Sequence, residues 1–194
     1  NPEPQRWDGV LLPFEPEQLR VLLPSVAQDS RSTKQITMAE VVLSDGQRLR
    51  AVNDLFIGPR THTSALYEIE QGGTKEFQSS SGLIISTGLG STAWMKSVMT
   101  GSMALAQASG MVAGKTGYKP MAWDADKLSF AVREPFPSRS SRATLVYGEV
   151  APGRSLKVRS RMPENGVIFS DGIEADFLSF TAGIEARVNI SPNK

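Results

Sequence analysis

The chain has 194 residues, which is enough for one large domain or two small ones with a sizeable core. Its formal net charge of +1 gives no reason to expect a nucleic-acid partner, and no segment approaches the roughly 20 apolar residues of a membrane helix, so no membrane partner is expected either. Cysteine is absent, which excludes disulfides and thiolate zinc sites. The sequence begins at Asn1 in a proline-rich phrase, and we expect it to be part of a longer protein.

Residues 1–34 are expected to form a lead-in loop and a short helix. Pro16 and Glu17 place proline and an acidic side chain in a first helical turn, and the pattern continues to Val26. Pro24 is expected to end or kink this helix, because proline has no backbone N–H to donate.

From Gln35 onward the sequence predicts a β-rich body, residues 35–194. The strand candidates are residues 36–43, 48–57, 63–70, 75–78, 82–86, 127–133, 143–150, 155–161, 166–170, 175–180 and 184–190. Turn signals lie between several of them, at Asp45-Gly46, Gly72-Gly73, Pro152-Gly153 and Asp171-Gly172. With one long helix at about Ser91 to Ala108, the pattern predicts a mainly β fold, a sandwich of many short strands.

The most informative stretch runs from Ser79 to Thr100. A nearly all-apolar run, residues 82–86, reads as a strand buried on both faces, and two glycines and the good N-cap residues Ser91 and Thr92 follow it. A strand, a glycine turn and a capped helix start aim backbone N–H groups at one point, which suits a polar group of a nucleotide. An ordinary strand-to-helix turn with glycines for close packing gives the same pattern.

Asn53 and Asp54 lie inside an otherwise apolar strand candidate. A buried polar group without a hydrogen bond costs about 1–3 kcal/mol, so these side chains either pair within the fold or await a ligand. An Asn amide can donate to and accept from an adenine edge, and a carboxylate can bind ribose hydroxyls.

Two motifs resemble the NAD kinase family. Residues 81–94, S-G-L-I-I-S-T-G-L-G-S-T-A-W, are similar to a signature that runs roughly D-G-L-hydrophobic-x-S-T-P-T-G-S-T-A-Y. Residues 51–57, A-V-N-D-L-F-I, resemble the family's A-L-N-E-hydrophobic motif. The mitochondrial-type branch is the most similar, because it shares Ile57-Gly58, Ser-Ser-Gly-Leu, a Trp in place of Tyr, Arg133-Glu134-Pro135 and a V-R-S-R strand. The resemblance covers most of the chain and is thinnest over residues 108–120 and over the last few residues.

The resemblance implies the C-terminal domain of the NAD kinase fold, without the N-terminal α/β nucleotide domain. The parent enzyme would transfer the γ-phosphoryl group of ATP, with Mg²⁺ on the phosphates, to the 2′-hydroxyl of the adenosine ribose of NAD, giving NADP. In the family the proton acceptor is the Asp of a Gly-Gly-Asp-Gly motif, and here Gly72-Gly73 is followed by Thr74. We therefore expect no catalytic residue, no tightly bound metal and no kinase activity in this chain alone.

The resemblance also implies partners, a location and site residues. The partners are the protein's own N-terminal domain and further copies, as a dimer or tetramer, in the cytoplasm or, in a eukaryote, in the mitochondrial matrix. The residues that match dinucleotide-binding positions are Asn53, Asp54, Ser81, Ser91, Thr92, Ala93, Trp94 and Ser97. Trp94 can either stack on the ligand or fill the core. The sequence departs from the family at three of these and neighbouring positions: Asp54 replaces Glu, Ser81 replaces Asp, and Leu89 replaces Ser or Thr. The affinity for the dinucleotide, or its orientation, is therefore expected to differ.

Other patterns are interpreted as structural. Gly114-Lys115-Thr116 lacks the earlier glycine that a Walker A loop requires, and His62, the only histidine, is expected at the surface without zinc or hydrolase chemistry. Six arginines of the last third are expected on a solvated strand face, with phosphate steering as the alternative: Arg133, Arg139, Arg142, Arg154, Arg159 and Arg161. Two rival functions stay open, a lipid or small-alcohol kinase of the same superfamily and a non-catalytic β-sandwich that binds proteins.

Overall fold

The computed structural model describes residues 1–6, 14–111 and 117–193, and the chain divides into two units, residues 1–34 and 35–194. In the first unit the 3₁₀ turn η1 (Pro16–Gln18) leads into helix α1 (Leu19–Ala27). The Glu15 backbone N–H donates to the Gln18 side chain at 3.1 Å, as in a capping box. Pro24 lies inside α1 and the helix continues to Ala27, so Pro24 does not end the helix.

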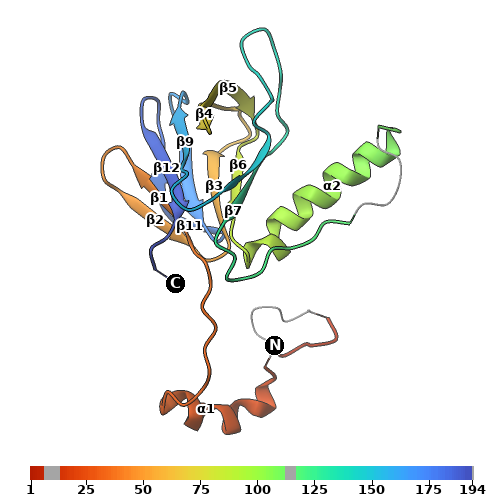
Figure 1. Ribbon diagram of the computed structural model, residues 1–194, viewed down its shortest axis with the longest axis vertical. Coiled ribbons are helices and arrows are strands. Elements are labelled where there is room, and N and C mark those ends of the chain that lie inside the picture. Colours follow the sequence, from red (N-terminus) through yellow and green to blue (C-terminus); the bar gives the residue numbers. More distant parts are fainter. Residues whose placement is uncertain (7–13, 112–116, 194) are drawn as a thin grey trace. The chain divides into compact units, whose positions relative to one another are not determined.

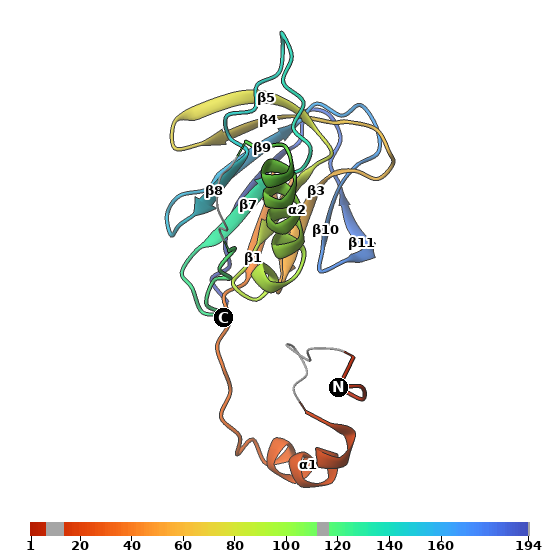
Figure 2. The same cartoon turned by 90° about the vertical axis from the view of Figure 1, so that its right-hand side faces the viewer.

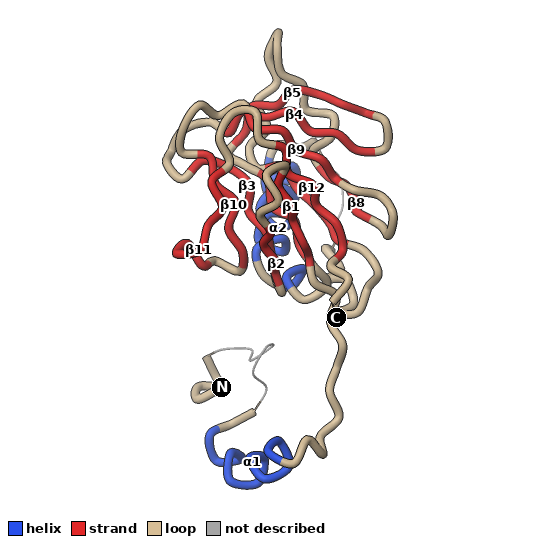
Figure 3. The backbone as a smooth tube through the Cα atoms, turned by 90° about the vertical axis from the view of Figure 1, so that its left-hand side faces the viewer, coloured by secondary structure: helices blue, strands red, loops and turns tan. Residues whose placement is uncertain are grey.

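The second unit contains two antiparallel sheets of six strands each (Figures 1 and 3). Sheet A has the order β2 (Arg48–Ala51), β1 (Ala39–Leu43), β12 (Glu185–Ile190), β9 (Leu156–Ser160), β4 (Ala65–Gln71) and β5 (Thr74–Ser80). Sheet B has the order β11 (Ile173–Ser179), β10 (Gly166–Ser170), β3 (Asp54–Pro59), β6 (Leu83–Ser86), β7 (Leu128–Val132) and β8 (Tyr147–Val150). The predicted mainly β fold of short strands is therefore confirmed.

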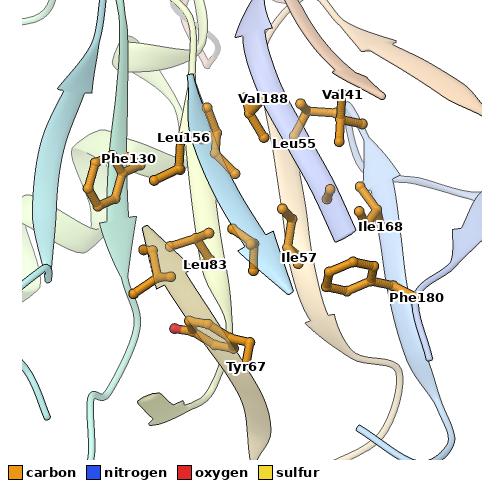
Figure 4. Close-up of a cluster of buried hydrophobic side chains, with 14 of the residues drawn as sticks. Val41, Leu55, Ile57, Tyr67, Leu83, Phe130, Leu156, Ile168, Phe180 and Val188 are labelled. Carbon is orange, nitrogen blue, oxygen red and sulfur yellow. The ribbon is translucent and has the colours of Figure 1, made fainter. Parts of the chain in front are cut away.

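The main core lies between the two sheets and draws side chains from both (Figure 4). Along β3, Leu55 and Ile57 point into this core and are fully buried, and Val158 and Val188 enter it from sheet A. Side chains alternate between the two faces of a strand, so Phe56, between Leu55 and Ile57, faces outward. Tyr67 is also buried in this core, and its hydroxyl donates to the Gln78 side chain at 3.0 Å.

The predicted strand over residues 48–57 is wrong as a single element. Residues 48–51 form β2 in sheet A, whereas β3 begins at Asp54 in sheet B. The chain therefore crosses from one sheet to the other at Val52 and Asn53. Apolar periodicity alone does not reveal such a crossing, because the alternation of Leu49, Ala51, Leu55 and Ile57 continues in phase across it.

Helix α2 (Trp94–Ala108), preceded by the 3₁₀ turn η2 (Gly90–Thr92), lies across the outer face of sheet B (Figure 2). A second apolar cluster joins it to the sheet, with Met95 of the helix packed against Phe56, Ile84 and Ala131. Because α2 covers that face, all four residues of β6 are buried, as predicted. No helix among the described residues is long and apolar enough to span a membrane.

Replacement of Ile57 by alanine is expected to lower the free energy of unfolding by about 2–5 kcal/mol, because it opens a cavity between the sheets. Urea denaturation followed by circular dichroism measures this loss. Leu105 on α2 is 73% exposed, and Leu105→Ala is the matched control, expected to change stability by no more than about 0.5 kcal/mol. Equal effects of the two substitutions would contradict the placement of the core.

Candidate functional site

The crossing between β2 and β3 is held by the carboxylate of Asp171, in the turn between β10 and β11. This carboxylate accepts backbone N–H groups from Val52 at 2.9 Å, Asn53 at 2.7 Å and Asp54 at 3.1 Å. In return, the Asp171 N–H donates to the carbonyl of Asp54 at 2.9 Å. The position of Asn53 and Asp54 therefore depends on a side chain more than a hundred residues away. The sequence marked Asp171 only as a turn residue.

Asp54 is a buried carboxyl group on the outer face of sheet B, with 7% of the residue exposed. Its Oδ1 atom is buried and has no hydrogen-bond partner among the described residues. The pKa of Asp54 is raised to about 6, mainly by burial and also by the Asp171 charge, while a hydrogen bond with Ser86 opposes the shift. The group is therefore mainly ionised at neutral pH, and its two protonation states become equally populated only about one pH unit lower.

The turn after β6 packs directly against the crossing. A Cβ atom at Gly90 would lie 2.1 Å from the carbonyl oxygen of Asn53 and 2.8 Å from Oδ1 of Asp54, so only glycine fits there. The Thr87 hydroxyl donates to the Val52 carbonyl at 2.6 Å and accepts the Gly90 N–H at 3.1 Å. Gly90 thus allows close packing, and this packing brings the turn against Asn53 and Asp54.

Ser91 and Thr92 do not cap α2. The buried Ser91 hydroxyl donates to the Gly88 carbonyl at 2.6 Å and accepts the Met121 N–H at 2.9 Å. The Thr92 hydroxyl donates to the Leu89 carbonyl at 2.9 Å. The N-cap residue is Ala93, which has no side-chain cap, because the 3₁₀ turn directs both hydroxyls back toward earlier carbonyls. Ala93 itself is exposed.

Tyr118 is a neighbour of this junction that the sequence did not identify. Burial is the main cause that raises the pKa of Tyr118, the neighbouring Ser91 lowers it, and Tyr118 lies close enough to Asp54 for that charge to help raise it. A ligand that reaches Oδ1 of Asp54 must therefore displace some of the packed groups around it. No motif near Tyr118 in the sequence indicates that it lies beside Ser91 and Asp54.

Ser81 and Trp94 belong to a different place, a pocket of about 450 Å³ on the same face of sheet B. The Trp94 ring stacks on Phe56 with centroids 5.6 Å apart, and the Arg133 guanidinium lies 5.5 Å from its centroid. Trp94 therefore contributes to the α2 cluster and also lines the pocket. Ser97, one helical turn later, is exposed.

The eight candidate residues are thus not all brought together. In the ladder between β3 and β6, Asp54 pairs with Ser86, and Ser81 precedes Ser86 by five positions. At about 3.3 Å per residue, Ser81 lies roughly 16 Å from the crossing. Asn53, Asp54, Ser91 and Thr92 form one group, which we call the crossing site, and Ser81 and Trp94 line the pocket.

The other candidates of the sequence are mostly at the surface. His62 is exposed at the rim of the pocket, and five of the six arginines are exposed, whereas Arg133 is half-buried in the pocket wall. Residues 114–116 lie outside the described residues. Within the described part of the chain there is no cluster of three or more His, Cys, Asp or Glu side chains that could hold a metal ion.

No family model and no curated protein matches this sequence. Among solved structures, the chain is similar to yeast NADH kinase in its crystal structure complexed with NADH, with a TM-score of 0.68 and 16% sequence identity. The match covers 94% of this chain and 48% of the kinase chain, so the chain spans about half the length of that protein. At this identity the similarity establishes the fold alone: the chain has the two-sheet architecture of the NAD kinase fold. Membership of the mitochondrial-type branch stays a prediction.

Replacement of Asp171 by asparagine is expected to lower the free energy of unfolding by about 1–3 kcal/mol. Asparagine keeps the shape and tolerates the positive φ of 53° at this position, but it loses the charge that three amides share. Chemical denaturation measures the loss. Asp176→Asn, at an exposed position of β11, is the matched control and should be nearly neutral; a neutral Asp171→Asn would show that the carboxylate does not hold the crossing.

The pKa of Asp54 predicts a pH-dependent stability. Its pKa is raised from 3.8 to about 6, so between these values the folded chain binds more protons than the unfolded chain. Stability therefore falls as pH rises through this window, by about 2–3 kcal/mol in total, and stays reduced above it.

Asp54→Asn should remove this fall, which unfolding measurements from pH 4 to pH 8 can detect. The Asp45 pKa is lowered by hydrogen bonds with Gln47, so Asp45→Asn should change the pH profile with the opposite sign. An Asp54→Asn profile parallel to that of the wild-type chain would contradict the burial of this carboxyl group.

Proposed function

We propose that the chain is the dinucleotide-binding part of an ATP-dependent NAD kinase. The whole enzyme would transfer the γ-phosphoryl group of ATP to the 2′-hydroxyl of the adenosine ribose of NAD, giving NADP. The similarity to yeast NADH kinase supports this class of enzyme at the level of the fold. The motifs at residues 51–57 and 81–94 support the particular reaction.

The observation that carries the proposal is the unpartnered Oδ1 atom of Asp54. A buried acceptor without a hydrogen bond is unfavourable by about 1–3 kcal/mol, and a ribose hydroxyl that donates to it would remove this penalty. The side-chain amide of Asn53 also forms no hydrogen bond with the described residues, although the residue is half-buried. Of the two alternatives for this pair, the missing partners favour the ligand.

In this proposal the chain binds and orients the dinucleotide, and it does not carry out the proton transfer. Phosphoryl transfer depends mainly on positioning and on neutralising charge. Asn53 would hold the adenine edge and Asp54 the ribose, while the small side chains at the start of α2 let the ligand approach the backbone. When bound to ATP, Mg²⁺ neutralises phosphate charge, but the described residues offer no cluster to hold it, so no step is assigned to a metal on this chain.

The proton acceptor and the ATP site would come from the N-terminal domain of the parent enzyme. The Gly-Gly-Asp-Gly motif is absent from the printed sequence, which supports an inactive polypeptide on its own. Further contacts are proposed with that domain and with other copies of the chain. The apolar side chains that α1 exposes, among them Leu19, Val21 and Val26, support contacts of this kind.

Asn53→Ala is expected to weaken NAD binding by roughly tenfold or more, because the loss of one or two well-placed hydrogen bonds has about this effect. Isothermal titration calorimetry of this polypeptide with NAD and NADP measures the change. Asn193→Ala removes the same group at an exposed position near the C-terminus and should leave the affinity unchanged.

Several outcomes would contradict the proposal, and the first two concern binding. The first is NAD binding of equal strength in Asn53→Ala and in the wild-type chain, or no NAD binding at millimolar concentration. The second is displacement of bound NAD by a lipid alcohol, which would favour a related lipid kinase as the function. A mixture with ATP, Mg²⁺ and NAD should form no NADP, and its formation by this polypeptide would show that the chain is not confined to binding.

A further inference from the structure

The outer face of sheet A has no helix packed on it, in contrast to the outer face of sheet B. Helix α2 lies in front of the sheets in Figure 2 and behind the strands of sheet A in Figure 3. Along these strands Val41, Val158 and Val188 point into the core, so their neighbours in the chain point outward. The outward residues of the described strands are exposed or half-buried, with the exception of Glu40.

The strand register places four basic side chains in a single row across this face. Each residue of the row lies directly opposite the next one, from the β2 edge of the sheet to the β5 edge. In this order the row consists of Arg48, Val42, Arg187, Lys157, Glu70 and Lys75. Neighbouring strands are about 4.8 Å apart, so the row is roughly 24 Å long. We call these six residues the basic row.

The carboxylates of this face neutralise the row only in part. Three of its four cations form ion pairs, which are Lys157–Glu70 at 2.8 Å, Lys75–Glu68 at 2.9 Å and Arg187–Glu185 at 3.8 Å. Glu68 also pairs with Arg161, so that one carboxylate serves two cations. Arg48 forms no ion pair with any described residue, and its side chain is therefore available to a partner.

Over the whole outer face of sheet A, positive charges exceed negative charges by three. The cations are Arg48, Arg50, Lys75, Lys157, Arg159, Arg161 and Arg187, and the carboxylates are Glu40, Glu68, Glu70 and Glu185, which is seven against four. Two further charges lie at the edges, Asp45 in the β1–β2 turn and Arg142, whose N–H donates to the Phe77 carbonyl of β5. They leave the difference unchanged. The formal net charge of the chain is only +1, so the remainder of the chain is net negative and the positive charge is concentrated on this face.

We propose that the basic row is a docking site for an extended acidic segment of a partner protein. An extended chain advances about 3.3 Å per residue, so roughly eight residues span the row, and alternate side chains of the segment face it about 6.6 Å apart. Carboxylates at these alternate positions bind Arg48 and Arg187 directly, since a guanidinium group can donate two parallel hydrogen bonds to one carboxylate. Lys75 binds a third carboxylate at the other end of the row.

The other side chains of this face favour a peptide over a nucleic acid. Phe77 is the one aromatic residue that points outward from the described strands of sheet A, and it is half-buried, so bases find no surface on which to stack. The four carboxylates repel a backbone that carries a charge on every unit, whereas a peptide can place a neutral residue opposite each of them. The row lies on the sheet that α2 does not cover, so the proposal does not depend on the dinucleotide at the crossing site.

The test is fluorescence anisotropy of a labelled octapeptide of alternating Glu and Thr, titrated with the whole polypeptide at low ionic strength. Saturable binding is expected, and it should weaken as added salt screens the charges. Arg48→Gln and Arg187→Gln should each weaken binding by roughly two- to fivefold, the range for exposed ion pairs. Lys96→Gln removes the same charge from an exposed position of α2 and should leave binding unchanged. Circular dichroism checks that every variant is folded at the temperature of the titration.

Each of four results with the peptide would overturn the proposal. These are the absence of saturable binding at low ionic strength, an affinity that does not change with salt, an equal affinity for an octapeptide in which Gln replaces Glu, and a loss in Lys96→Gln as large as that in Arg48→Gln. Tighter binding of a single-stranded oligonucleotide with the same number of negative charges would assign the row to a nucleic acid instead, which also contradicts the proposal. Because NAD is absent from all these titrations, failure of the proposed function leaves their outcome unaffected.

Discussion

Three consecutive backbone amides, those of Val52, Asn53 and Asp54, donate to one carboxylate at the place where the chain passes from sheet A to sheet B. Without an acceptor these amides would be shielded polar groups with no partner, because Val52 and Asn53 belong to neither strand and Asp54 is the first residue of β3. Asp171 supplies the acceptor from the turn of the β10–β11 hairpin, and its own N–H closes the arrangement through the carbonyl of Asp54. The two sheets are therefore joined through a contact between distant parts of the chain.

The same arrangement explains why Asp54 is buried with an unusual pKa. Once the crossing is fixed, β3 begins at Asp54 and places its side chain under the turn of Gly90, whose Cα fits only because it carries no Cβ. The carboxylate cannot turn away to solvent, and a second carboxylate, Asp171, lies nearby and adds to the cost of ionisation. The fold thus keeps a buried carboxyl group at the start of a central strand, and the Oδ1 atom of Asp54 remains a hydrogen-bond acceptor without a donor among the described residues.

Much of the architecture could be predicted from the sequence, since alternation and turn residues locate hairpins such as β4–β5, where Gly72 and Gly73 both have positive φ. The division of residues 48–57 between two sheets could not, because it depends on Asp171, which is distant in sequence. The prediction that Ser91 caps α2 was wrong for a related reason. Its hydroxyl forms hydrogen bonds with Gly88 and Met121, and these contacts depend on tertiary packing. The pocket was also missed, because its arginines come from separate loops and no motif links them.

The outer face of the β3–β6 pair explains how one short ladder has two chemically different ends. Alternation places Asp54, Phe56 and Gly58 on this face of β3, and the antiparallel register sets Ser86 opposite Asp54 and Ile84 opposite Phe56. One end of the ladder is therefore polar, and the middle is apolar and covered by Met95 of α2. At the other end the backbones of Gly58 and Gly82 make room for the ring of Phe56, which would meet a Cβ at either position. Met95 of α2 covers the apolar middle, so hydrogen-bonding groups lie at one end of the ladder and aromatic rings with arginines at the other.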